Sequence, residues 1–405
     1  MGFDNLFGPS FDFIFFLLPI VLPIGLVYTL FELWVSFARE RFINSQQHVL
    51  LRIIPPRDFH KTPLAMELFI NALYQKGGET TFIDRLWYGK VRAWFSLEMA
   101  SHEGEVSFYI WTRKVLSPFL QSQIYAQYPG IEVSEVEDYV SKVDYHSDEY
   151  HMFGIEYGLV APDPVPIKTY VDYGLDKVES KDELKIDPIT PSLEFLGSLK
   201  QGEHAWIQII VRAHVKEDQD KKKWFGKTDN WIDEATDLIK DIKEKSVYEN
   251  KKGEIVPLAT KGQADKIYAI ERSVSKLGFD CGIRSIYIAR KEAFNGINIP
   301  GLLGSFKQYG SFNLNGFKPI VLTSFDFFWQ DITGNKLKKI KKEIYDAYKA
   351  RDYFWRKIER KPRKKFVLNS EELATIYHFP GADVQTPSLT RVQSRKGNAP
   401  SNLPI

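Results

Sequence analysis

Cysteine is almost absent from this chain, since its 405 residues include only Cys281. A single thiol cannot form an intramolecular disulfide, so the sequence excludes a small secreted scaffold held together by disulfides. Cys281 lies beside a segment typical of a β-strand, where we expect a buried, reduced thiol. The cysteine count therefore fits a reducing compartment.

An excess of charge of either sign is also missing. The 54 Lys and Arg residues nearly balance the 52 Asp and Glu residues, which leaves a formal net charge of +2. Any attraction to nucleic acid or anionic lipid would therefore have to come from local clusters. Hydrophobic residues make up 44% of the chain, enough to fill the cores of about two or three domains at this length.

Motifs for catalysis are missing as well. Gly226-Lys227-Thr228 resembles the end of a phosphate-binding P-loop, but the loop requires a glycine where this chain has Lys221. The polar cluster His146–His151 lacks the HExxH spacing of a helical zinc site, and we expect it to be a solvated connector. We therefore predict that the chain is not an enzyme and has no catalytic residues, metal ion or cofactor.

A long apolar run, by contrast, is present near the start of the chain. Residues 13–31 contain no charged side chain, and a helix of this length, at about 1.5 Å per residue, just crosses a hydrocarbon core of roughly 30 Å. We predict a transmembrane anchor over residues 1–42. Its lipid-facing candidates are Phe13, Phe16, Pro19, Pro23, Tyr28 and Phe31.

Two alternatives to an anchor fit this run less well. A secretory signal needs basic residues before the run, where this chain has Asp4 and Asp12. A buried core helix would usually be shorter and have a polar face. Arg39 and Arg41 follow the run, so we expect a single-pass protein of the cytoplasmic membrane with its N-terminus outside and its body in the cytoplasm. Pro19 and Pro23 would kink the helix, where partner helices could pack.

Residues 43–145 alternate between strand-like and helix-like patterns. The predicted elements are a strand at 48–56, a helix at 62–75, two strands joined by a turn at 102–104, a helix from 117 to about 127 and a strand at 131–139. This β-α-β-β-α-β order is typical of a ferredoxin-like, or split βαβ, module. Such modules have many unrelated functions, so the order selects no chemistry.

Residues 146–330 repeat the alternation after a proline-rich joint at 162–166. The predicted elements are strands at 167–173, 204–215 and 283–289 and helices at 190–199 and 264–277. A charged stretch at 216–257 interrupts them as a surface insertion. We therefore expect an α+β protein with two ferredoxin-like modules behind its anchor.

Basic residues gather in a helical segment at 331–368. The predicted helix at 336–349 carries several lysines, and the following RKIERKPRKK at 356–365 is almost wholly basic. Basic runs among aromatic residues can bind nucleic acid or anionic lipid, although many charged runs only solvate a helix face. All three interpretations stay open. The candidate contact residues are Lys338, Lys341, Arg360, Arg363, Lys364 and Lys365.

The last stretch resembles a known family. SEELATIYHFPG (370–381) and SRKGNAPSNLP (394–404) resemble the segment leading into the motor domain of conjugative, type IV secretion-like ATPases of the HerA/FtsK class from candidate-phyla bacteria. LGSLKQGEHAWIQIIVRA (196–213) and IRSIYIA (283–289) are similar to the same membrane-anchored, non-catalytic region. The resemblance covers nearly the whole chain but rests on structural motifs. Since the sequence stops at Ile405, it implies either a motor encoded separately or a stand-alone accessory subunit.

The resemblance implies a scaffold of a type IV secretion or conjugation-like DNA-transfer machine. Its partners would be membrane lipid, a cytoplasmic ATPase and further copies of itself. Residues 369–405 would form a proline-rich docking tail, and the candidate docking residues are His378, Pro380, Gly381, Leu403 and Pro404. The alternative is a membrane-tethered nucleic-acid-binding protein that grips DNA with residues 336–365.

Overall fold

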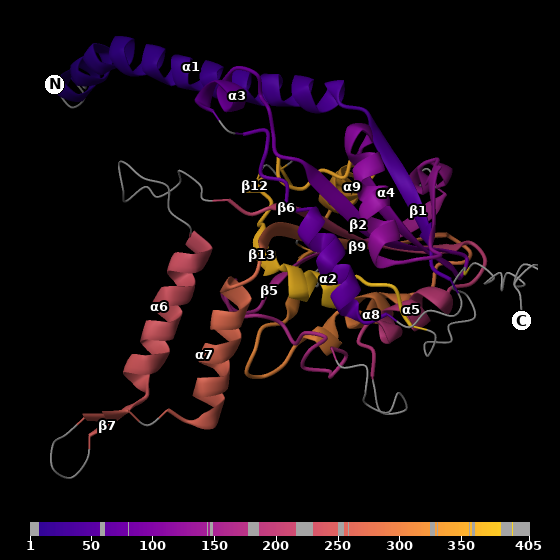
Figure 1. Cartoon of the computed structure of the whole chain (residues 1–405). Coiled ribbons are helices and arrows are strands. Elements are labelled where there is room, and N and C mark those ends of the chain that lie inside the picture. The colour runs from indigo at the N-terminus through magenta and orange to yellow at the C-terminus, as the bar shows by residue number, and fades with distance from the viewer. Residues whose placement is uncertain are drawn as a thin grey trace, which may run out of the picture. The chain divides into compact units, whose positions relative to one another are not determined.

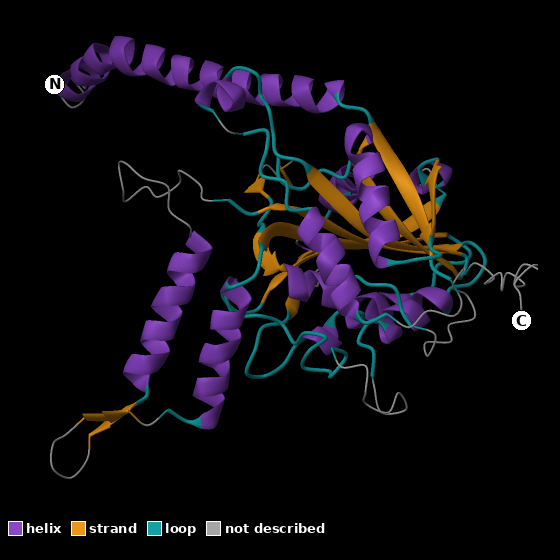
Figure 2. Ribbon diagram, viewed as in Figure 1, coloured by secondary structure: helices purple, strands orange, loops and turns teal. Residues whose placement is uncertain are grey.

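The structure is a computed structural model in which two compact units are distinguished (Figures 1 and 2). The first contains residues up to Gln47 together with Lys76–Ala93, and the second contains His48–Gln75 and the chain from Trp94 onward. The described residues are 8–56, 61–79, 81–143, 145, 149–176, 186–215, 230–249, 255–257, 259–324, 329, 331–355, 357–358, 361–381 and 391.

The first unit consists mainly of one long helix. α1 (Gly8–Ser45) runs through the apolar segment and continues well beyond it, with Pro19 and Pro23 inside it. It is the one helix among the described residues that is long and apolar enough to cross a membrane. A second, short helix, α3 (Phe82–Leu86), belongs to the same unit, and the side chain of Thr81 caps its start.

The second unit is built on one antiparallel sheet of nine strands in the order β10-β5-β9-β6-β2-β3-β1-β4, with β13 also paired to β9. The α+β class with an N-terminal apolar helix is thus confirmed. The strands are β1 (His48–Ile54), β2 (Trp94–His102), β3 (Glu105–Arg113), β4 (Glu132–Val136), β5 (Tyr150–Leu159), β6 (Glu203–Ala213), β9 (Gly278–Arg290), β10 (Phe317–Leu322) and β13 (Phe366–Asn369).

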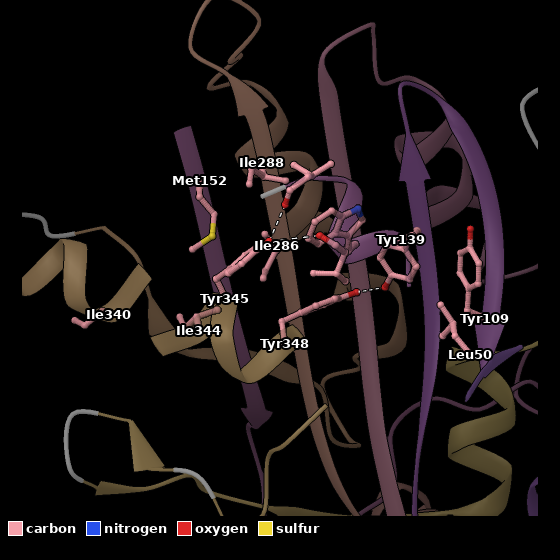
Figure 3. Packing of buried hydrophobic residues seen from close by; sticks show 14 of the residues in the cluster. Leu50, Tyr109, Tyr139, Met152, Ile286, Ile288, Ile340, Ile344, Tyr345 and Tyr348 are labelled. Carbon is pink, nitrogen blue, oxygen red and sulfur yellow. Dashed lines mark hydrogen bonds between the residues drawn. The ribbon is translucent and has the colours of Figure 1, made fainter. Parts of the chain in front are cut away.

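Side chains alternate between the two faces of this sheet, as the strand period requires. One face carries Tyr109 and Trp206 and is covered by the helix α9 (Asn335–Lys349) and the 3₁₀ turn η3 (Tyr139–Lys142). Figure 3 shows this packing from close by. Phe108 faces the other way and contacts the rings of Tyr377 and Phe379.

Short helices follow the strands of both halves of the sheet. Pro63 stands at the start of α2, and the turn between β2 and β3 uses two residues with positive φ, Glu103 and Gly104. α10 packs against α2, and α2 packs against α4. These helices are α2 (Pro63–Ala72), α4 (Ser117–Gln127), α5 (Thr190–Gly197), α8 (Asn298–Gly304) and α10 (Ser370–Ile376).

The predicted insertion at 216–257 supplies one helix of a hairpin, and the helix predicted at 264–277 corresponds to the other. α6 (Asn230–Lys245) and α7 (Lys261–Val274) pack side by side and are linked through the small strands β7 (Val247–Glu249) and β8 (Ile255–Pro257), as Figure 1 shows. Ala235 and Ile270 form a small core with Val165. α7 begins with a full capping box between Thr260 and Gln263.

The strands differ from the prediction at two places. Residues 167–173 form turns, because the backbone N–H and the hydroxyl of Thr169 donate to Asp172, at 2.7 and 3.2 Å. β5, which starts inside the predicted polar connector, is a largely buried strand that the sequence pattern did not indicate. β2 and β6 pair over nine residues, so the strands of both expected modules belong to one continuous sheet.

Candidate functional site

The apolar helix is the first candidate site, because it exposes large apolar side chains along its described length. Tyr28 is 65% exposed and Phe31 45% exposed, and none of the most apolar stretch of the helix is buried. Pro19 and Pro23 are exposed too, whereas the side chains of Phe13 and Phe16 lie outside the described residues. A core helix would bury such a surface, so the geometry argues against that alternative.

The basic segment is the second candidate, and α9 within it is amphipathic. Ile340, Ile344 and Tyr348 are buried under the sheet, and Lys338 is exposed on the outer side. Lys341 is half-buried, and burial lowers the pKa of its ammonium group. Lys338 therefore keeps the expected surface position, while Lys341 is partly withdrawn from solvent.

Arg351, directly after α9, is part of a buried ion-pair network. Its Nε lies 3.0 Å from Glu98 Oε1, and its Nη2 donates to Asp138 Oδ1 at 2.9 Å. The Arg351 side chain is 1% exposed and that of Glu98 0%. Burial alone would lower the pKa of Arg351, but the two carboxylates hold this pKa above its ordinary value. An uncompensated charge could not be kept at this depth.

Polar groups of three further elements complete this network. Tyr139 donates its hydroxyl proton to Glu98 Oε2 at 2.8 Å, and the hydroxyls of Tyr139 and Tyr348 are 2.6 Å apart. Figure 3 shows these two hydroxyls facing each other. Gln208 on β6 donates to Glu98 Oε1 at 2.8 Å. Burial raises the pKa of both tyrosines. The network therefore ties α9 and η3 to β2 and β6.

Arg363, one of the candidate contact residues, is buried in an ion pair. Its Nε lies 2.6 Å from Glu156 Oε1 on β5, and both side chains are at most 1% exposed. Lys364, its neighbour, is exposed. Arg360 lies outside the described residues.

Lys365 also faces the body, since its Nζ is 3.1 Å from Asp280 on β9 and its side chain is 35% exposed. Asp280 is fully buried and pairs with Arg212 and His214 as well. Burial would raise the pKa of Asp280, but the hydrogen bond of His214 and the charges of Arg212 and Lys365 hold it well below its ordinary value. The basic segment therefore supplies counter-charges to carboxylates of the sheet.

The expected docking tail begins inside the core. β13 pairs with β9, and every residue of α10 is buried. Asn369 and Glu372 form a capping box at the start of α10. Glu371 is paired with Arg272 and Lys276, at 2.6 and 2.7 Å. A tail was therefore the wrong interpretation of residues 369–381.

His378 and Pro380 were expected to dock a partner, but both are buried. His378 Nε2 donates to Asp187 Oδ1 at 3.0 Å, and Nδ1 lies 2.9 Å from the carbonyl oxygen of Ala374. Burial alone would lower the pKa of His378, whereas Asp187 and the carbonyl raise it above its ordinary value. Gly381 is half-exposed. Leu403 and Pro404 lie outside the described residues.

Residues considered for chemistry are scattered. Gly226–Thr228 and His146 lie outside the described residues, and His151 packs against the ring of Phe294. Among the described residues, no group of three or more His, Cys, Asp or Glu side chains is placed to hold a metal ion. Cys281 is buried as expected, and burial raises the pKa of its thiol.

One cleft of ≈ 400 Å³ lies between the turns at 166–172, α7 and α10. Its charged lining residues include Arg272 and Glu371, which already neutralise each other across 2.6 Å. Sequence patterns missed this juxtaposition, because the two residues are 99 positions apart.

Comparison with known proteins adds no family: no family model and no curated protein matches this chain.

Proposed function

We propose that this chain is a non-catalytic, membrane-anchored subunit of a type IV secretion or conjugation-like machine, and that it holds a separately encoded HerA/FtsK-class ATPase at the inner membrane. The observation that carries the proposal is an exposed apolar helix, long enough to cross a bilayer. It is attached to a body in which two candidate residues, Arg363 and His378, are buried in ion pairs. Arg39 and Arg41 after the apolar run favour a cytoplasmic body.

Strand order supports the ferredoxin-like part of the proposal. The segments β1-α2-β2-β3-α4-β4 form the sheet order β4-β1-β3-β2, which is the arrangement of a split βαβ unit. The segments β5-α5-β6, β9-α8-β10 form the corresponding order β10-β5-β9-β6. The body would then be two such units joined through β2 and β6, with the α6–α7 hairpin inserted into the second. Such a platform is suited to holding a partner.

The docking surface needs revision under this proposal. His378 and Pro380 are buried, so an ATPase cannot contact them without opening the core. The proposed docking residues are therefore those after Gly381, including Leu403 and Pro404.

Co-expression with a HerA/FtsK-class ATPase that lacks a membrane anchor of its own tests the proposal. We expect the ATPase to sediment with membranes only when the full chain is present, and to stay soluble when residues 382–405 are deleted. An ATPase that remains soluble beside the full chain would contradict the proposal. The purified chain with ATP and Mg²⁺ should show no turnover above that of a buffer control, and clear turnover would overturn its non-catalytic part.

A second function, membrane-tethered nucleic-acid binding, is favoured by the exposed lysines on the outer side of α9. Lys336, Lys338, Lys339 and Lys342 are all exposed. If this surface binds DNA, binding should weaken steeply with salt, and replacing these lysines with serine should reduce the salt slope. Binding without such a slope would exclude this function.

A further inference from the structure

The residues that accompany α1 in the first unit expose a second apolar surface. Phe82, Ile83, Trp87 and Tyr88 lie in and directly after α3, and they are 69, 60, 64 and 56% exposed. Four neighbouring large apolar side chains of this exposure are unfavourable in water. Their neighbours Asp84 and Lys90 form an ion pair at 2.8 Å.

This surface is fixed to α1 at one level of the helix. The indole Nε1 of Trp34 donates to the carbonyl oxygen of Leu86 at 3.1 Å, and the rings of Trp34 and Trp87 are 5.2 Å apart. Gly89 has φ +60°, and a Cβ at this position would lie 2.2 Å from the carbonyl carbon of Ala38. Only glycine allows this close approach. Figure 1 shows α3 lying against α1.

The contact level coincides with the end of the apolar surface of α1. Leu33 and Phe37 are 63 and 57% exposed, and the next side chains along the helix include Arg39, Glu40 and Arg41. Counted back from Phe37, about 20 residues at about 1.5 Å each reach Leu18 and match a hydrocarbon core of roughly 30 Å. Glu32, near the Phe37 end, is the one charged residue in this stretch. The cytoplasmic boundary of the hydrocarbon would therefore fall next to Trp34 and α3.

We propose that α3 and the two aromatic residues after it insert into the interfacial layer of the bilayer beside α1, as a second membrane contact that fixes the depth of the anchor. Trp and Tyr rings are favoured at this level because they combine an apolar body with a polar edge. The occupant is lipid rather than a protein partner, because the surface continues the lipid-facing side chains of α1 at their boundary. This inference rests on the anchoring part of the proposed function.

Fluorophore labelling in nanodiscs tests the inference with the full chain. The buried Cys281 is first replaced by Ser, and a polarity-sensitive NBD label is attached to Ile83→Cys or Tyr88→Cys in nanodiscs of three parts phosphatidylcholine to one part phosphatidylglycerol. We expect a blue-shifted emission and a loss of fluorescence that is stronger with spin labels near the headgroups than with labels deep in the acyl chains. No lipid quenching at either position would overturn the inference.

Two control positions separate this result from the anchor itself. A label at Val27→Cys, 66% exposed on α1, should be quenched by the deep spin label. If Val27 is quenched and positions 83 and 88 are not, the anchor stands and the second contact is refuted. If Val27 is not quenched, the anchor itself fails. A label at Ile297→Cys, 78% exposed in the other unit, should show no quenching, and quenching equal to that of position 83 would refute a specific contact.

Discussion

α1 and the sheet of the second unit differ in which side chains they expose and which they bury. Val27 and Leu30 of α1 are 66 and 67% exposed, whereas Glu98 and Arg284 of the sheet are fully buried. Exposed apolar side chains are stable in a hydrocarbon solvent, and buried charges are stable only when they are paired and hydrogen-bonded. The anchor therefore depends on its surroundings, while buried carboxylates of the sheet are neutralised within the protein, as Arg351 of the basic segment neutralises Glu98.

The largest expected effect is on the anchor. Replacing Gly25 and Val27 with Arg should abolish membrane insertion, because each arginine near the centre of a transmembrane helix costs about 2.5–3.5 kcal/mol. The protein should then be released from membranes by alkaline carbonate. Ser45→Arg, at the end of α1, is the matched control and should stay in the membrane pellet. Retention of the doubly substituted chain in the pellet would show that α1 does not span the bilayer.

Removing the partner of a buried carboxylate should have the next largest effect. Arg351→Met leaves Glu98 and Asp138 without their guanidinium, and we expect it to lower the free energy of unfolding by about 3–5 kcal/mol. Urea unfolding in detergent, followed by tryptophan fluorescence, measures this loss. The double variant Arg351→Met, Glu98→Gln should lose less than the sum of the two single variants. Simple additivity would mean that the pair is not coupled.

Two adjacent residues of the basic segment, Arg363 and Lys364, should differ in their effect on stability. Arg363→Met should be strongly destabilising, by about 3 kcal/mol, because it leaves the buried Glu156 without its counter-charge. Lys364→Met should change the free energy of unfolding by no more than about 0.5 kcal/mol, because Lys364 is exposed. The same unfolding assay measures both. Equal effects at the two positions would contradict the orientation of this segment.

These ion pairs also show which features of the structure can be predicted from local sequence patterns. The apolar stripe of α9 and the turn at Glu103–Gly104 could be predicted, because their signals repeat within a few residues. The burial of Arg363 could not, because Glu156 is 207 positions away in the chain. A locally basic segment therefore looked like a ligand surface when its counter-charges lay on distant strands.

Contacts between distant parts of the chain also decide the structure of residues 370–381. SEELATIYHFPG was predicted to belong to a docking tail, because it resembles the segment that leads into the motor domain of the related ATPases. Its apolar residues instead pack with α2, and its carboxylate Glu371 pairs with Arg272. The capping residue Asn369, three positions before Glu372, was the local signal that could have indicated a helix here.

The smallest expected effect is a pH dependence centred on Asp163. Its Oδ2 accepts a hydrogen bond from the Val367 N–H at 2.9 Å, and burial raises its pKa from 3.8 to about 6. A carboxyl group with a raised pKa in the folded state binds its proton more tightly there than in the unfolded chain. Stability should therefore fall as the pH rises from about 4 through about 6.

Asp163→Asn isolates this contribution, because asparagine keeps an acceptor for the Val367 N–H and cannot ionise. The variant should show a flatter dependence of the urea midpoint on pH between 4 and 7 than the unaltered chain, measured in the same detergent. Asp176→Asn is a control outside this contact and should leave the slope unchanged. A slope that is identical in all three proteins would mean that Asp163 stays ionised in the folded state, and that the Val367 N–H and the charge of Lys364 outweigh its burial.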